Sequence, residues 1–89
     1  MTVRCRVFRS EKKAETYLYL SDGLGFDELP AGLRETFGEP SLVMELELDE
    51  QRRLARVDVR SVIEGLAGDG YYLQLPPKLP IEEEIRRRL

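Results

Sequence analysis

The chain has 89 residues, of which 42% are hydrophobic and 35% charged, and its net charge is −3. This composition is typical of one small globular domain and excludes a disordered chain. The negative net charge disfavours a general binder of nucleic acid, DNA in particular, but leaves room for a local basic patch.

The cysteine content and the start of the chain bear on location. The only cysteine, Cys5, cannot form an intramolecular disulfide, which fits a reducing compartment. The first residues lack the long apolar region of a signal peptide, and no run approaches the length of a membrane span. We therefore expect a cytoplasmic protein that has no membrane partner.

Two strands are predicted at the start of the chain, over residues 3–8 and 14–20, with a polar hairpin loop between them. The first strand sets Val3, Cys5 and Val7 against Arg4 and Arg6. The second strand sets Thr16, Leu18 and Leu20 against Glu15, Tyr17 and Tyr19. Side chains alternate between the two faces of a strand. We therefore expect an antiparallel hairpin with aliphatic residues on one side and tyrosines and arginines on the other.

A flexible connector over residues 21–25 leads to a short helix predicted over residues 29–37. Its apolar residues recur at spacings of four, and Pro30 suits its first turn. The next strand, residues 41–48, has a core face and a wetter face. The core face consists of Leu42, Met44, Leu46 and Leu48, and the wetter face of Val43, Glu45 and Glu47. Residues 54–57 fit either a short edge strand or an irregular lead-in.

The clearest helix is predicted over residues 58–68, where Asp58 can cap the N-terminus. Its apolar residues follow the helical spacing: Val59, Val62, Ile63, Leu66 and Ala67. The aromatic run that follows, ending at two prolines, predicts the central strand of the sheet, with Leu73 fully buried.

A last helix is predicted from Pro80 to Leu89, within the C-terminal stretch 79–89. Its apolar stripe is Ile81, Ile85 and Leu89, and its Glu–Arg pairs are spaced four residues apart. The stripe needs a docking partner, because exposed pairs contribute only about 0.2–0.5 kcal/mol each. The element order predicts a single α+β domain over residues 1–89. We expect a mixed sheet of about four strands, with helices on one face.

Several runs of the sequence match a known family in order and rough spacing. They are Cys5 with Val7-Phe8-Arg9-Ser10, Thr16-Tyr17-Leu18-Tyr19-Leu20, Phe37-Gly38-x-Pro40 and Gly70-Tyr71-Tyr72-Leu73-Gln74-Leu75-Pro76-Pro77. In these runs the chain resembles the YcgL domain family of small proteobacterial proteins. The resemblance implies a compact α/β domain in the cytoplasm with no established activity and no catalytic residue to carry over. Some members are encoded near ribonuclease D, so the resemblance hints at RNA metabolism.

Enzymatic chemistry is poorly supported. The chain has no histidine, which excludes His-dependent triads and imidazole metal ligands. Cys5 is better explained as a buried, unreactive residue than as a nucleophile, and Glu45 and Glu47 as a solvated face than as an acid–base pair. Three loop acids could hold a hard cation weakly, but solubility explains them better: Asp22, Asp27 and Glu28. We predict no catalytic residue, metal or cofactor.

One set of residues suggests a partner-binding face: Arg4, Arg6, Tyr17, Tyr19, Tyr72 and Gln74. If the four strands form one sheet, all six are expected opposite the aliphatic residues. Tyrosine and arginine on an open sheet can stack single-stranded bases and hold phosphates. The alternative is that they pack across strands and shield backbone hydrogen bonds. Acidic residues on the same face would repel phosphate and favour this alternative.

Two hypotheses remain. The first is a non-enzymatic binding module, with a protein or single-stranded RNA as its partner. The second is a small-molecule or enzymatic role at the loop of residues 21–28 and the strand ends. A clustered surface of tyrosine and arginine would favour the first hypothesis, and a deep pocket with convergent carboxylates would favour the second.

Overall fold

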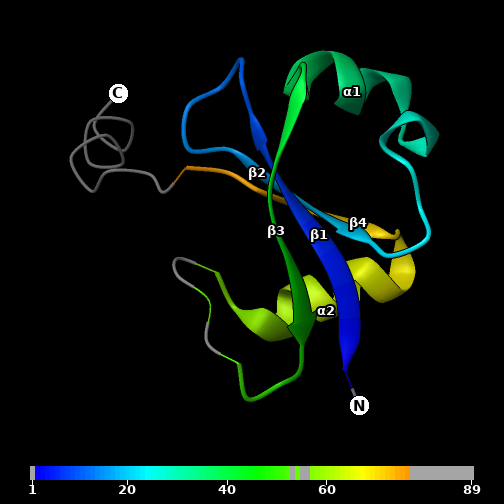
Figure 1. The fold of residues 1–89 in the computed structure, drawn as a ribbon, viewed down its shortest axis with the longest axis vertical. Helices are drawn as coiled ribbons and strands as arrows, with labels where there is room; N and C mark the ends of the chain where they lie inside the picture. Colours follow the sequence, from blue (N-terminus) through cyan, green and yellow to red (C-terminus); the bar gives the residue numbers. More distant parts are fainter. Residues whose placement is uncertain (1, 53, 55–56, 77–89) are drawn as a thin grey trace, which may run out of the picture.

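The computed structural model describes residues 2–52, 54 and 57–76 (Figure 1). Its elements in chain order are β1 (Val3–Ser10), β2 (Tyr17–Ser21), η1 (Phe26–Glu28), α1 (Ala31–Phe37), β3 (Pro40–Leu48), α2 (Val59–Gly68) and β4 (Tyr71–Gln74). The helix predicted over residues 80–89 lies outside the described residues. Within the described part, no helix is both long enough and apolar enough to cross a membrane.

The four strands form one sheet in the order β3-β1-β2-β4, and every neighbouring pair is antiparallel. The α+β class is thus confirmed, but the expectation of a mixed sheet is wrong. The chain passes β1 on its way from β2 to β3, and it then crosses from one edge of the sheet to the other between β3 and β4. Strands that run in the same direction therefore never become neighbours.

The aromatic strand β4 is an edge strand rather than the central one. It pairs with β2 alone in the described sheet, and its Leu73 is only partly buried. The fully buried leucines lie instead on β2, where Leu18 and Leu20 are both 0% exposed. The prediction that Leu73 is fully buried is wrong, because an edge strand has a neighbour on one side only.

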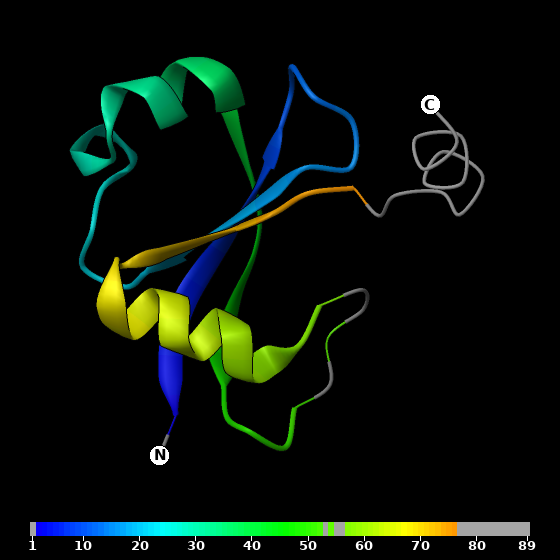
Figure 2. The ribbon, with the colours of Figure 1, turned by 180° about the vertical axis from the view of Figure 1, so that it is seen from behind.

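The helices lie on both faces of the sheet, not on one face as expected. Helix α2 covers one face, seen in front of the sheet in Figure 2. This α2 face carries Cys5, Val7, Tyr19, Leu48 and Tyr72, which pack with Val59, Val62 and Leu66 of α2. The opposite α1 face carries Phe8, Leu18, Leu20, Tyr71 and Leu73, which pack with Leu29, Leu33 and Phe37 around α1. The fold therefore has three layers and two apolar cores.

The register of β1 against β2 decides which residues share a face. Val7 lies opposite Tyr19, and Phe8 lies opposite Leu18. The tyrosines of β2 therefore share a face with the small apolar residues of β1, and the leucines of β2 share a face with the arginines of β1. A shift by one residue would reverse both assignments. Each face of β2 packs against a helix, so the alternating sequence of this strand does not show which of its residues face α1 and which face α2.

Helix α2 begins and ends as the sequence predicts. The carboxylate of Asp58 accepts a hydrogen bond from the backbone N–H of Arg60 at 3.2 Å, and Gly70 closes the turn to β4 with φ +85°. Gly65 lets the helix approach β4, since a Cβ there would lie 3.0 Å from the Tyr72 ring. The undecided segment before α2 contributes only an isolated bridge between Leu54 and Val57, so it is a lead-in and not a strand of the sheet.

Candidate functional site

Helix α2 covers only one end of its face. It runs across β1 at a steep angle (Figure 2), so its width of about 10 Å covers only part of this strand, whose 8 residues span about 26 Å. At the covered end, Leu48 and Val62 are both 0% exposed. Towards the other end, the same face continues through Val7 and Met44, which lie opposite each other on β1 and β3. Part of the apolar sheet therefore extends beyond the helix.

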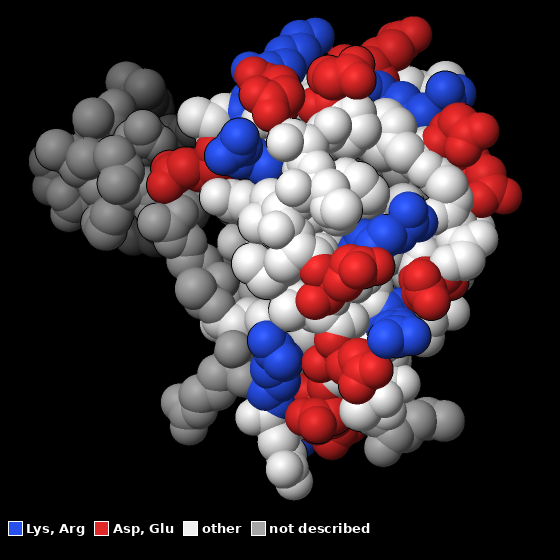
Figure 3. All heavy atoms as spheres, viewed as in Figure 1, with Lys and Arg blue, Asp and Glu red and all other residues white. Residues whose placement is uncertain are grey.

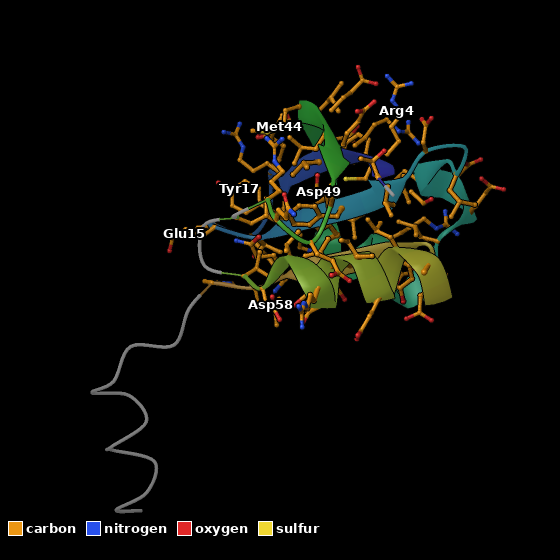
Figure 4. The ribbon with its side chains drawn as sticks, turned by 90° about the horizontal axis from the view of Figure 1, so that it is seen from below. Arg4, Glu15, Tyr17, Met44, Asp49 and Asp58 are labelled. Carbon is orange, nitrogen blue, oxygen red and sulfur yellow. The ribbon has the colours of Figure 1, made fainter. Side chains whose placement is uncertain are left out.

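This uncovered end forms a groove of about 470 Å³. We call it the groove; it is lined by Val7, Tyr17, Tyr19, Val43, Met44, Leu46 and Leu54, with Glu15, Arg52 and Gln74 as its polar residues. Figure 4 shows Met44 and Tyr17 at the same end of the sheet, with Glu15 beside Tyr17. Such a volume, with apolar walls and a few polar groups, is typical of binding sites.

One wall of the groove is the edge strand β3, and it exposes large apolar side chains. Val43 is 43% exposed and Met44 47% exposed. Met44 lies opposite Val7 but Leu42 lies opposite Phe8, so Val43 is an extra residue in a β-bulge. Figure 3 shows an area without charged side chains over this strand, between charged groups at its two ends. Exposed apolar surface of this kind marks interaction sites.

Two polar side chains of the groove hold each other in place. The Tyr19 hydroxyl donates a hydrogen bond to Oε1 of Gln74 at 2.9 Å, which fixes both side chains. Burial raises the pKa of Tyr19, and negative charge on Cys5, Tyr72 or Tyr17 would raise it further. Tyr19 therefore stays a neutral hydrogen-bond donor and supplies no phenolate at neutral pH.

The six residues of the predicted partner-binding face do not form one surface. Tyr17, Tyr19, Tyr72 and Gln74 lie on the α2 face, whereas Arg4 and Arg6 lie on the α1 face. The expected single face is wrong, because the register of β1 and β2 pairs odd residues with odd residues. The structure brings Tyr17, Tyr19 and Gln74 together in the groove. Tyr72 packs edge-on against Tyr19, with ring centroids 6.2 Å apart.

The two arginines interact with the protein itself. The Arg4 side chain forms an ion pair with Glu47 at 3.5 Å, and both are largely exposed. The Arg6 guanidinium donates a hydrogen bond to the carbonyl of Leu24 and lies 5.6 Å from the centre of the Phe8 ring. Neither arginine is therefore placed beside the tyrosines that were expected to stack bases.

The loop of residues 21–28 makes local contacts. The Glu28 carboxylate accepts a hydrogen bond from the backbone N–H of Gly25 at 2.6 Å, which helps to cap η1. A polar hollow of about 260 Å³ beside the loop is lined by Arg4, Asp22 and Glu47 among others. In the described residues, no group of three or more acidic, cysteine or histidine side chains could hold a metal ion. A small-molecule or enzymatic role for this loop stays a prediction.

Cys5 lies in the core under α2, as predicted, and is 2% exposed. Burial raises the pKa of its thiol to about 11, although the positive charge of Arg52 works in the opposite direction. Almost no thiolate exists at neutral pH, so the thiol is a poor nucleophile.

Sequence reasoning missed the role of Val43 and Met44. The alternation of residues 41–48 assigns Met44 to the core face, and its side chain does point to the α2 face. However, Met44 is 47% exposed and is not among the residues that pack with α2. The signal available in the sequence is the unbroken apolar triplet of residues 42–44, in a segment that otherwise alternates. Such a triplet fits a bulge or a surface that another molecule covers.

Comparison with known proteins gives one consistent result. The family model of the YcgL domain matches residues 5–77. A YcgL domain-containing protein of Proteus mirabilis is 38% identical over 89 residues, which cover 100% of this chain and 90% of the relative. A YcgL domain-containing protein of Photobacterium profundum is 49% identical over 73 residues, covering 82% of this chain and 78% of the relative. Protein YcgL of Escherichia coli is 40% identical over 85 residues, covering 96% and 77%.

Proposed function

The chain belongs to the YcgL domain family, and from this premise we propose that it is a non-enzymatic binding module whose groove takes an apolar segment of a partner protein. Every residue that lines the groove falls within the matched residues 5–77. The described lining of the groove is thus built by the family domain itself. A cytoplasmic location is part of the proposal, because the single cysteine suits a reducing compartment.

The observation that carries the proposal is the exposure of Val43 and Met44 at the wall of an apolar groove. An aliphatic side chain that is fully buried in such a groove contributes about 1.5–3 kcal/mol. The outer edge of β3 adds backbone groups that an extended segment can pair with. Apolar anchors in the groove and backbone pairing along β3 are the two contacts that such a segment would make.

A protein partner fits the groove better than RNA does. Base stacking needs open aromatic rings, but Tyr19 is only 6% exposed. Phosphate contacts need several cations on the same surface. Among the described residues that line the groove, Arg52 is the one cation and Glu15 adds a negative charge, while Arg4 lies on the other face in an ion pair with Glu47. A link to RNA metabolism would therefore run through a protein partner rather than through direct contact with bases.

Affinity capture from a lysate of the source organism tests the proposal. We compare the unaltered chain with Met44→Asp and with Leu42→Asp, a matched control on the same strand whose side chain points to the opposite face. Both side chains are exposed, at 47% and 58%, so neither change disturbs the core. We expect a specific protein to be lost with Met44→Asp, retained with Leu42→Asp and unaffected by ribonuclease. Equal loss with the two variants, or loss after ribonuclease, would contradict the proposal.

A further inference from the structure

We propose that the chain's own C-terminal segment, residues 81–89, docks as a helix into the groove and is the occupant that a partner must displace. The displacement step rests on the proposed function, whereas the docking itself does not. The argument uses the position where the chain leaves the sheet, the length of the remaining chain, and the pattern of its apolar residues.

The chain leaves the sheet beside the groove. β4 ends at Gln74, which pairs with Tyr17, and both residues line the groove. Leu75 follows directly and is 62% exposed. Pro76, the last described residue, follows Gln74 by two positions and so lies within about 7 Å of it. The described part of the chain therefore ends close to the groove.

The length of the segment matches the width of the sheet. From β4 to β3 the sheet crosses three strand spacings, which amount to about 14 Å. Residues 81–89 in a helix span about 13.5 Å, and residues 75–80 can reach up to about 20 Å when extended. Residues 75–80 are thus long enough for the helix to set its central residue, Ile85, at Met44 on β3.

The chemistry of the segment matches the groove. Ile81, Ile85 and Leu89 recur every four residues, so they form one aliphatic stripe on a helix. The glutamates and arginines between them pair with each other at the same spacing, which leaves the stripe as the side that needs a partner. A nine-residue helix is too short to be stable alone in water. The groove offers an apolar surface that lies within its reach.

Disulfide trapping in the full-length chain tests the docking. We compare the double variant Met44→Cys/Ile85→Cys with Leu42→Cys/Ile85→Cys under mild oxidation, and identify the products by intact mass. Positions 42 and 44 are both exposed, but they lie on opposite faces of β3. The native Cys5 is 2% exposed and does not compete.

We expect an intramolecular disulfide to form at least about tenfold faster from position 44 than from position 42, because docking raises the effective concentration of residue 85 at the groove. Rates that agree within about twofold would overturn the proposal. Disulfide-linked dimers formed from position 44 would also overturn it, and would assign the groove to a second copy of the chain.

A second measurement separates failure of the docking from failure of the proposed function. Ile85→Asp removes the centre of the stripe, and Arg87→Asp makes a larger change in charge on the other side of the helix. In affinity capture, we expect Ile85→Asp to increase the yield of the partner protein and Arg87→Asp to leave it unchanged. If the disulfide forms from position 44 but no partner protein is captured, the groove is filled only by the chain's own segment and the proposed function is wrong. If a partner protein is captured but the disulfide does not form, the proposed function stands and the docking is wrong.

Discussion

The two faces of the sheet each leave one end uncovered, and these two ends differ in chemistry. On the α2 face the uncovered end is the apolar groove around Val7 and Met44. On the α1 face it carries Arg4 and Glu47, which form an ion pair on the surface. The same two strands, β1 and β3, build both ends with alternate residues. One end is already suited to water, whereas the other exposes apolar side chains, and the proposed binding site rests on this difference.

The largest effect on stability is expected from comparing two residues of β3, one at the covered end of the α2 face and one at the uncovered end. Leu48→Ala should reduce the free energy of unfolding by about 2–5 kcal/mol, because Leu48 is 0% exposed beneath α2. Met44→Ala should reduce it by less than about 1 kcal/mol, because Met44 is 47% exposed. Urea denaturation of both variants measures the difference. Equal losses would mean that Met44 is buried as deeply as Leu48, which would contradict the difference between the two ends.

The covered end also predicts a dependence of stability on pH. Burial raises the pKa of Cys5 from an ordinary value near 9 to about 11, so the folded chain keeps a proton that the unfolded chain releases. This contribution is fully present below pH 9 and is lost as the pH rises through about 11. A shift of this size corresponds to at most about 2–3 kcal/mol.

The variant Cys5→Ala isolates this effect, because it removes the titrating group while the other ionisable groups remain. We expect unfolding free energies measured by denaturant between pH 8 and pH 11 to fall more steeply for the unaltered chain than for the variant. Parallel curves would be incompatible with a buried Cys5 thiol.

An intermediate effect is expected where α2 approaches β4. Gly65→Ala should destabilise the fold by about 1–3 kcal/mol, although alanine favours helices, because the new Cβ would crowd Tyr72. A backbone oxygen, that of Tyr71, lies 3.1 Å from the Cβ position and cannot move without shifting β4. Gly68→Ala is the control, since nothing lies within 4 Å of its Cβ position. A rise in melting temperature with Gly65→Ala would show that α2 is not pressed against β4.

The smallest effect is expected at the charged end of the α1 face. Removing the Arg4–Glu47 pair should change stability by about 0–1 kcal/mol, because both side chains are exposed and water screens their attraction. A double-mutant cycle with Arg4→Ala and Glu47→Ala measures the coupling between them. A coupling energy well above this range would mean that this end is more buried than the structure shows.

Local features of this fold could be predicted from the sequence, whereas features that depend on distant pairing could not. The cap of α2 at Asp58 and the alternation in each strand depend on neighbouring residues. The positions of β2 and β4 in the sheet depend on pairing between distant segments, so the aromatic run of β4 does not by itself show that this strand lies at the edge. The candidate site shows the same limit. Tyr17 and Gln74 were identified, but which face they occupy depends on the register with β1.

The most direct test of the interaction surface is site-specific photo-cross-linking in living cells, with a photoreactive residue placed at position 44 or at position 47 of β3. Position 44 lies in the groove, and position 47 lies at the charged end of the opposite face. The account predicts a discrete protein adduct, resistant to ribonuclease, from position 44 and none from position 47. The same adduct from both positions, or an adduct from position 47 alone, would contradict it.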